Sequence, residues 1–206
     1  MLAMTLLVLQ IADSQAIVLF RDIPNLPKDL LGWCIAASGF GTLLAAGLNG
    51  FVSKYAISPL LKMGVGGMLL GLVFAFTGAF AIIGTFNQLG VIIILILFVL
   101  AGLGAGMTFI PFQVMLQQRT PEALIGRVFG AVTSVTSTAA LIGPIVGGYL
   151  VTTFGPQIAF IISGSLVALI GCVLLVFKSV ILKHDGMVQS TGVPAARNNI
   201  VLGEMK

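Results

Sequence analysis

The feature that most constrains this chain is the length of its uncharged apolar stretches. Residues 63–118 contain no Asp, Glu, Lys or Arg. As one helix rising about 1.5 Å per residue, this stretch would be far longer than the roughly 30 Å needed to cross a bilayer core. It must turn back on itself, and residues 84–90, Gly-Thr-Phe-Asn-Gln-Leu-Gly, are typical of a turn. The sequence therefore predicts a chain that is solvated mainly by lipid.

Composition and charge exclude several classes of protein. The chain is 58% hydrophobic and 8% charged, whereas a soluble domain has roughly a quarter charged residues. The formal net charge is +4, but the basic residues are scattered and form no basic-aromatic patch, so we expect no nucleic-acid partner. Cys34 and Cys172 stand alone in apolar stretches, so we expect neither a disulfide, a metal site nor a cofactor.

The uncharged stretches predict an all-α membrane protein with six transmembrane helices. The transmembrane domain covers residues 1–178, and residues 179–206 have the polar composition of a disordered tail. Basic residues are concentrated on the side that holds both termini, which predicts a multi-pass protein of the cell membrane with both termini in the cytoplasm. The expected helices are residues 2–20, 31–53, 63–84, 89–116, 127–152 and 157–178.

A weak internal repeat relates the two halves of the domain. Residues 49–53, Asn-Gly-Phe-Val-Ser, lead through a short loop to Pro59, much as residues 147–151, Gly-Gly-Tyr-Leu-Val, lead to Pro156 about 98 residues later. Three helices separate the copies, so they run in opposite directions across the membrane. The pattern predicts two inverted three-helix repeats, an arrangement found in secondary transporters.

Asp13 is an acidic residue near the middle of the first expected helix. A carboxylate at mid-membrane costs about 2.5 to 3.5 kcal/mol on insertion scales, so it needs a wet cavity, a partner or a proton. Gln10 and Ser14 lie at helical spacing from it and extend a polar stripe. One interpretation is a proton-coupling site beside a substrate cavity, and the other is a carboxyl that only fixes helix packing.

The fourth expected helix combines glycines at 102, 104 and 106 with Pro111, which removes a helical hydrogen bond and allows a bend. Thr108, Gln113 and Gln117 follow the same helix, and we expect them to line the substrate cavity. The alternative is a tilted helix whose glutamines bond to neighbouring helices.

Small residues form a ridge on the fifth expected helix. Ala139, Gly143 and Gly147 follow at intervals of four, which allows another backbone to approach closely. We interpret the segment as a conformational element, and ordinary small-residue packing is the alternative. The residues of the motif are Gly130, Ala139, Gly143, Pro144, Gly147 and Gly148.

The loop before this helix carries Arg119, Glu122 and Arg127. Thr120 is expected to cap a short helix that begins at Pro121. The three charged residues are interpreted as a cytoplasmic latch that breaks and reforms during transport, or else as a static anchor of the loop.

These last two segments resemble the major facilitator superfamily, in particular its drug:proton antiporter branch with macrolide-efflux and enterobactin-exporter proteins. In that branch a loop reads Pro, a few residues and Arg-Gly-Arg-Val-Phe-Gly; here residues 125–130 read Ile-Gly-Arg-Val-Phe-Gly after Pro121. Residues 130–148 are similar to the antiporter motif, with Ala139 in place of a glycine. Residues 50–62 lack the Gly-x-x-x-Asp-Arg pattern usual in N-terminal halves, so the resemblance implies the C-terminal six-helix half.

The resemblance also implies a function. It predicts a secondary active transporter that exports amphipathic small molecules or drugs by proton antiport and alternating access, with Asp13, Gln10 and Gln113 facing the substrate. Its expected partners are membrane lipid, substrate, protons, and an N-terminal six-helix half or a second copy. We do not expect transport by the chain alone.

Two other classes compete with this prediction. A non-transporting six-helix scaffold or a channel would use the glycines for packing only. An intramembrane protease is not expected, because residues 163–165, Ser-Gly-Ser, lack the Gly-x-Ser-Gly nucleophile pattern and the lone His184 lies in the tail. The chain is therefore predicted not to be an enzyme.

Overall fold

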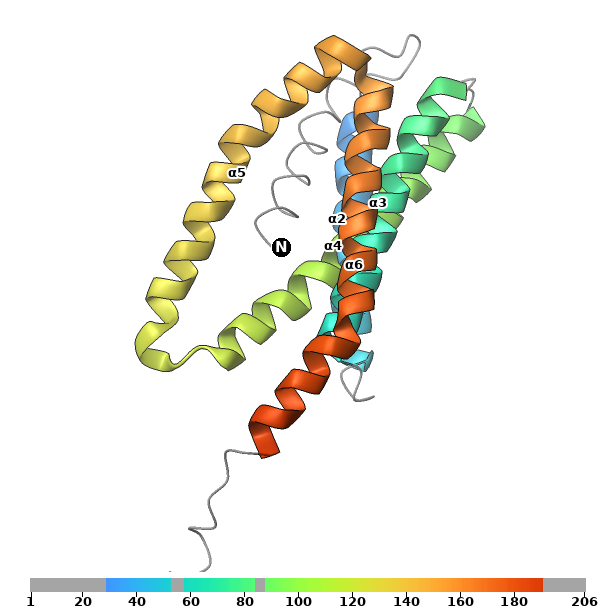
Figure 1. The fold of residues 1–206 in the computed structure, drawn as a ribbon. Coiled ribbons are helices and arrows are strands. Elements are labelled where there is room, and N and C mark those ends of the chain that lie inside the picture. Colours follow the sequence, from blue (N-terminus) through green and yellow to red (C-terminus); the bar gives the residue numbers. More distant parts are fainter. Residues whose placement is uncertain (1–28, 53–57, 84–87, 191–206) are drawn as a thin grey trace, which may run out of the picture.

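The computed structural model describes residues 29–52, 58–83 and 88–190, and the side chains of the last helix as far as Val176. Every regular element in these residues is helical. Five are long α-helices, and a short 3-10 helix, η1, lies between the fourth and fifth (Figure 1). The elements are α2 (Leu30–Val52), α3 (Pro59–Ile83), α4 (Gln88–Arg119), η1 (Glu122–Leu124), α5 (Ile125–Phe154) and α6 (Pro156–Ser190).

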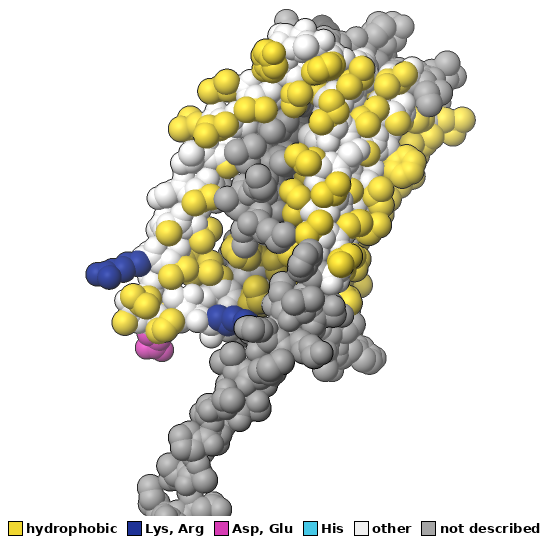
Figure 2. Space-filling view, viewed as in Figure 1, with side chains coloured by type: hydrophobic (Ala, Val, Ile, Leu, Met, Phe, Trp, Pro, Cys, Tyr) yellow, Lys and Arg dark blue, Asp and Glu magenta, His cyan; other side chains and the backbone are white. Residues whose placement is uncertain are grey.

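All five long helices are long and apolar enough to cross a membrane. Large apolar side chains cover their outer surfaces, as Figure 2 shows for one face, and Trp33 is 66% exposed. In lipid such side chains are in a favourable solvent, while helical hydrogen bonds satisfy the backbone without water. The described part of the chain is therefore a multi-pass membrane structure.

Glycines bring α3 and α6 into close contact along their length. A Cβ added to Gly71 would lie 2.6 Å from the carbonyl oxygen of Gly164 and 2.7 Å from the Cα of Ala168. The rings of Phe74 and Phe160 pack edge to face beside this contact, with centroids 5.8 Å apart and planes at 86°. Since lipid tails are as apolar as the side chains, this backbone approach and shape fit are what hold the pair together.

The same principle joins α4 to both α2 and α3. Gly102 lies against the backbone of Ser38 on α2, and a Cβ on Gly104 would lie 2.9 Å from the carbonyl oxygen of Gly66 on α3. The hydroxyl of Thr42 donates a hydrogen bond of 3.2 Å to the carbonyl of Gly102. These contacts make α2, α3, α4 and α6 one packed group.

The helix α5 stands apart from this group over most of its length (Figure 1). It meets η1 at one end and α6 at the other, where the chain turns at Gly155. Gly155 has φ of 86°, a conformation that glycine adopts without steric cost. Its N–H donates to the carbonyl of Val151 at 2.9 Å and closes the last turn of α5.

The helix bounds differ most from the sequence-based expectation in two places, and the other ends agree within three residues. The first is α3, which begins at Pro59 rather than at residue 63, because proline is well suited to the first helical position and a lysine side chain in the first turn can extend along the helix. The second is α6, which continues to Ser190, so residues 179–190 of the expected tail are helical. The expected helix over residues 2–20 lies outside the described residues.

Candidate functional site

The expected proton-coupling residue and part of the expected substrate cavity lie outside the described residues. These are Asp13, Gln10 and Ser14. Their roles remain predictions, and the described helices supply the surroundings in which the other expected site residues can be placed.

Thr108 lies in the contact between α4 and α3. Its side chain is 8% exposed, and its hydroxyl donates to the carbonyl of Gly104 at 2.8 Å. A longer contact of 3.5 Å joins the hydroxyl to the carbonyl of Met63, and the missing side chain of Gly66 makes room for it. In this conformation Thr108 contributes to helix packing rather than to the wall of a cavity.

Pro111 is inside α4, and it marks the part of the helix that leaves the packed group. Beyond it α4 diverges from α2 and α3 and runs toward η1 (Figure 1). A proline has no N–H, so the carbonyl of Met107 loses its usual helical partner, which makes a bend inexpensive here. Gln113 and Gln117 both lie exposed on the diverging part, where they are accessible to a solute.

The small-residue motif of α5 is divided between two faces. One face is buried, and the opposite face is open: a Cβ on Gly130 or Gly148 would meet nothing within 4 Å. The hydroxyls of Ser134, Thr136 and Thr138 each donate to the carbonyl four residues earlier, as expected from the sequence. The buried residues are Ala139, Gly143 and Gly147, and the exposed ones are Gly130, Pro144 and Gly148.

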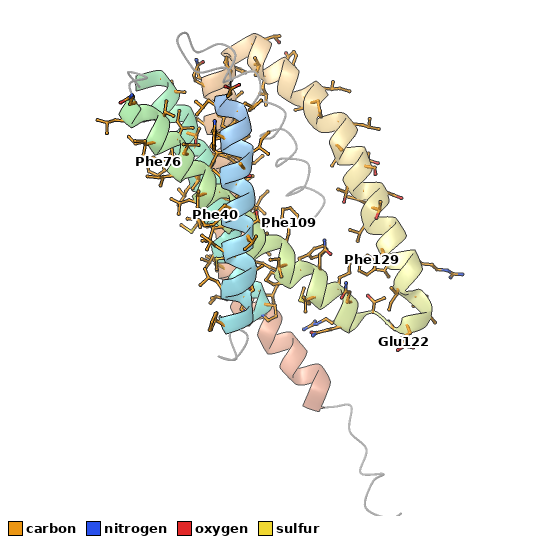
Figure 3. The ribbon with its side chains drawn as sticks, turned by 180° about the vertical axis from the view of Figure 1, so that it is seen from behind. Phe40, Phe76, Phe109, Glu122 and Phe129 are labelled. Carbon is orange, nitrogen blue, oxygen red and sulfur yellow. The ribbon has the colours of Figure 1, made fainter. Side chains whose placement is uncertain are left out.

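The charged loop residues Arg119, Glu122 and Arg127 are all exposed where α4 connects to α5. Figure 3 shows Glu122 at this turn, and Figure 2 shows basic and acidic side chains at this end of the molecule. The expectation that Thr120 caps the short helix is wrong. Its hydroxyl donates to the carbonyl of Leu116 at 2.6 Å, back into α4, and η1 has no side-chain cap.

A pocket that sequence reasoning did not anticipate lies where α2 ends and α3 begins, beside the diverging part of α4. It is a cavity of about 400 Å³. Its polar side chains are Asn49, Lys62 and Gln118, and most of the others are apolar. The sequence-based expectation began this helix at residue 63 and left Lys62 in the loop, whereas the structure places it in the first turn of α3. The remaining lining residues are Ala46, Gly50, Pro59, Ile110, Pro111, Val114 and Met115.

Five apolar spanning helices, joined through close glycine contacts and broken by an internal proline, define a helical multi-pass membrane protein. Among the residues that the structure describes, no group of three or more His, Cys, Asp or Glu could hold a metal ion. The sequence pattern of the Major Facilitator Superfamily matches residues 2–201. The chain belongs to the major facilitator superfamily.

One relative is an uncharacterized MFS-type transporter, YfiS, of Bacillus subtilis (strain 168). It is 38% identical to this chain over 175 residues, which are 85% of the chain and 41% of the relative. The chain thus spans less than half of the length of that protein. No solved structure matched the chain.

Proposed function

We propose that this chain is the C-terminal half of a secondary active transporter that exports amphipathic small molecules by proton antiport and alternating access. Membership of the major facilitator superfamily supports transport as the activity. That membership is the observation that carries the proposal. The packing of α3 against α6 agrees with the inverted repeat that the sequence predicts.

The starts of α3 and α6, Pro59 and Pro156, are 97 residues apart. When the two helices are aligned by this offset, Gly71 is equivalent to Ala168, and these two residues touch each other. The other contacts then fall into equivalent pairs. The side chain of Leu175 lies 2.6 Å from a Cβ position on Gly64, and that of Ile161 lies 2.9 Å from the Cβ position on Gly78.

Each contact in that pair is converted into the other by exchanging α3 with α6. A two-fold axis through the contact between Gly71 and Ala168 would produce this relation. Any two antiparallel helices in contact show this relation, and an antiparallel α3–α6 pair is what two inverted three-helix repeats require. In secondary transporters that architecture places a substrate site near the bilayer midplane.

In the proposed mechanism the first helix supplies the proton site, Asp13, with Gln10 and Ser14 beside it. The part of α4 beyond Pro111 supplies Gln113 and Gln117, which are exposed. Thr108 is bonded inside a helix contact, so we no longer assign it to the cavity. The opposite wall would come from an N-terminal six-helix half or from a second copy, since alternating access rocks one bundle against another.

The motif of α5 and the charged loop have supporting roles in this proposal. The buried face with Gly143 allows a close backbone contact that a rocking bundle can slide along. The protein would lie in the plasma membrane with both termini in the cytoplasm. The cytoplasmic latch at the membrane surface would be formed by Arg119, Glu122 and Arg127. The second candidate is a non-transporting scaffold or a channel, for which tight glycine packing would suffice.

Replacement of Asp13 by Asn tests the proposal. Asp13→Asn in the complete transporter should abolish substrate-driven proton movement in proteoliposomes while leaving insertion unchanged, because the amide cannot carry a proton. The matched control is Asp29→Asn, an exposed carboxyl just before α2, which should transport normally. Uphill export by the Asp13 variant would refute proton coupling at this residue, and a wild-type protein without any counter-movement of protons would favour the channel or scaffold.

A further inference from the structure

Lys62 is a lysine in an unusual environment for a membrane surface. It lies in the first turn of α3, lines the pocket between α2, α3 and α4, and is only 9% exposed. Lysines are rarely buried unless they are paired, because removing the charge from water is costly. The acidic residues with described side chains are Asp29 and Glu122, and neither lines this pocket.

Ser58 places a second polar group at the same helix end. Its carbonyl accepts the N–H groups of Leu61 and Lys62, at 3.0 and 3.4 Å, so Ser58 occupies the capping position of α3. Its hydroxyl oxygen is buried, and it has no hydrogen-bond partner in the part of the chain that is described. A helix N-terminus has a partial positive charge and free N–H groups, which favour an anion.

The proposed internal repeat offers a comparison for Lys62. With the offset of 97 residues between α3 and α6, the position equivalent to Lys62 is Ala159. Ala159 is fully buried. A small apolar residue thus occupies the aligned position, whereas Lys62 lines a pocket with residues of α2 and α4. The charge therefore calls for an explanation other than the α3–α6 interface.

We propose that this pocket binds a phosphate oxyanion, with Lys62 as its counter-charge and the N-terminus of α3 beside it as a source of hydrogen-bond donors. The pocket volume of about 400 Å³ accommodates a phosphate group together with its substituent. The site lies where α2 ends and α3 begins, and the ends of membrane-spanning helices are expected near the headgroups of a bilayer. Basic pockets between membrane helices are known to hold anionic headgroups.

The oxyanion can come from an anionic phospholipid or from a free phosphate ester. The apolar wall formed by Ile110, Val114 and Met115 gives an acyl chain or glycerol backbone a surface to contact. A free phosphate would use only the polar end of the pocket. Both sources share the same contacts with Lys62, and an experiment with separate lipid and phosphate probes distinguishes them.

The test measures binding to the complete chain in detergent micelles by native mass spectrometry and by the shift of the melting temperature. The probes are phosphatidylglycerol, phosphatidylcholine, inorganic phosphate and glycerol 3-phosphate. We expect phosphatidylglycerol to bind more tightly than phosphatidylcholine and Lys62→Gln to weaken it about 10- to 100-fold, the range for a charge-assisted hydrogen bond.

The matched control is Arg127→Gln, which removes one exposed positive charge. It should change binding less than about twofold, because a surface charge attracts anionic lipid only weakly and without a fixed site. Equal losses in the Lys62 and Arg127 variants would reduce the effect to general surface attraction and overturn the site. Equal binding of phosphatidylglycerol and phosphatidylcholine, with no binding of either phosphate probe, would overturn it as well.

Lys62→Met adds a readout that does not depend on ligand affinity. Without an anion the methionine variant should melt at the same temperature as the wild type or higher, because a buried cation without a partner is replaced by an apolar side chain of similar length. With phosphatidylglycerol the wild type should gain stability and the variant should not. If the variant is less stable than the wild type by the same amount in both conditions, Lys62 has a purely structural role and the proposal fails.

Discussion

Addition of one methyl group at the centre of the contact between α3 and α6 should separate these two helices. In Gly71→Ala the new Cβ would fall against the backbone nitrogen of Ala168, 2.7 Å from its Cα and 2.6 Å from the carbonyl oxygen of Gly164. These neighbours are backbone atoms, so no side-chain rotation can relieve the overlap. Either helix must move, and the ring contact of Phe74 with Phe160 beside it must move too.

Two opposing terms determine the size of the effect. Overpacking of a dense contact costs about 1 to 3 kcal/mol. Alanine is a better helix former than glycine by about 1 kcal/mol. Gly39→Ala on α2 is the matched control, because it has the same propensity gain and its Cβ would meet nothing within 4 Å. The propensity term then cancels, and the Gly71 variant should be less stable than the Gly39 variant by about 1 to 3 kcal/mol.

The assay is reversible unfolding in mixed micelles with rising SDS, followed by far-ultraviolet circular dichroism. The wild type and both variants are compared in the same detergent, and the free energies of unfolding are subtracted. If the two glycine variants agree within about 0.5 kcal/mol, the size of an ordinary surface effect, the close approach of α3 and α6 does not stabilise the fold and the argument from backbone contact is wrong.

Two further predictions concern the core and the topology. Phe160→Ala should lower the free energy of unfolding by about 3 kcal/mol, because the ring is fully buried between α3 and α6. The control is Leu141→Ala on the open face of α5, where the side chain is 73% exposed. It should change the free energy of unfolding by less than about 0.5 kcal/mol. Single cysteines at Lys54, Arg119 and Gln189, in a variant with Cys34 and Cys172 replaced by alanine, should react with a membrane-impermeant maleimide only from the cytoplasm. Labelling from outside intact cells would contradict the six-helix topology.

The existence of the helices could be predicted from the sequence because the bilayer leaves few alternatives. A run such as residues 63–118 can be satisfied only by spanning helices with a turn between them, and the structure ends α3 and begins α4 around that turn. The exact bounds were less predictable. Charge and polarity set the expected ends, but Pro59 begins a helix within the polar loop, and α6 continues beyond its expected end at residue 178 as far as Ser190.

The partners of individual polar side chains could not be predicted from one sequence. Thr120 could either cap η1 or bond to its own helix. In the structure its hydroxyl donates to the carbonyl of Leu116 at 2.6 Å. The hydroxyl of Thr108 similarly donates to the carbonyl of Gly104, and the missing side chain of Gly66 leaves space for it. Spacing along a helix shows which face a hydroxyl shares, but which helix covers that face depends on the packing of the whole bundle.

The pocket around Lys62 is a further case in which the surroundings of a polar side chain depend on the packing of the helices and could not be predicted from the sequence. Hydroxyls within the helices bond to carbonyls of the preceding turn, as Thr77 does with Val73 at 2.8 Å, so they need nothing from outside the bundle. Lys62 and the hydroxyl of Ser58 differ, because both are donors that are buried at a helix end where no earlier turn supplies an acceptor. Donors without an acceptor are costly to bury. Because Lys62 lines the pocket, its burial there favours a bound anion as its partner.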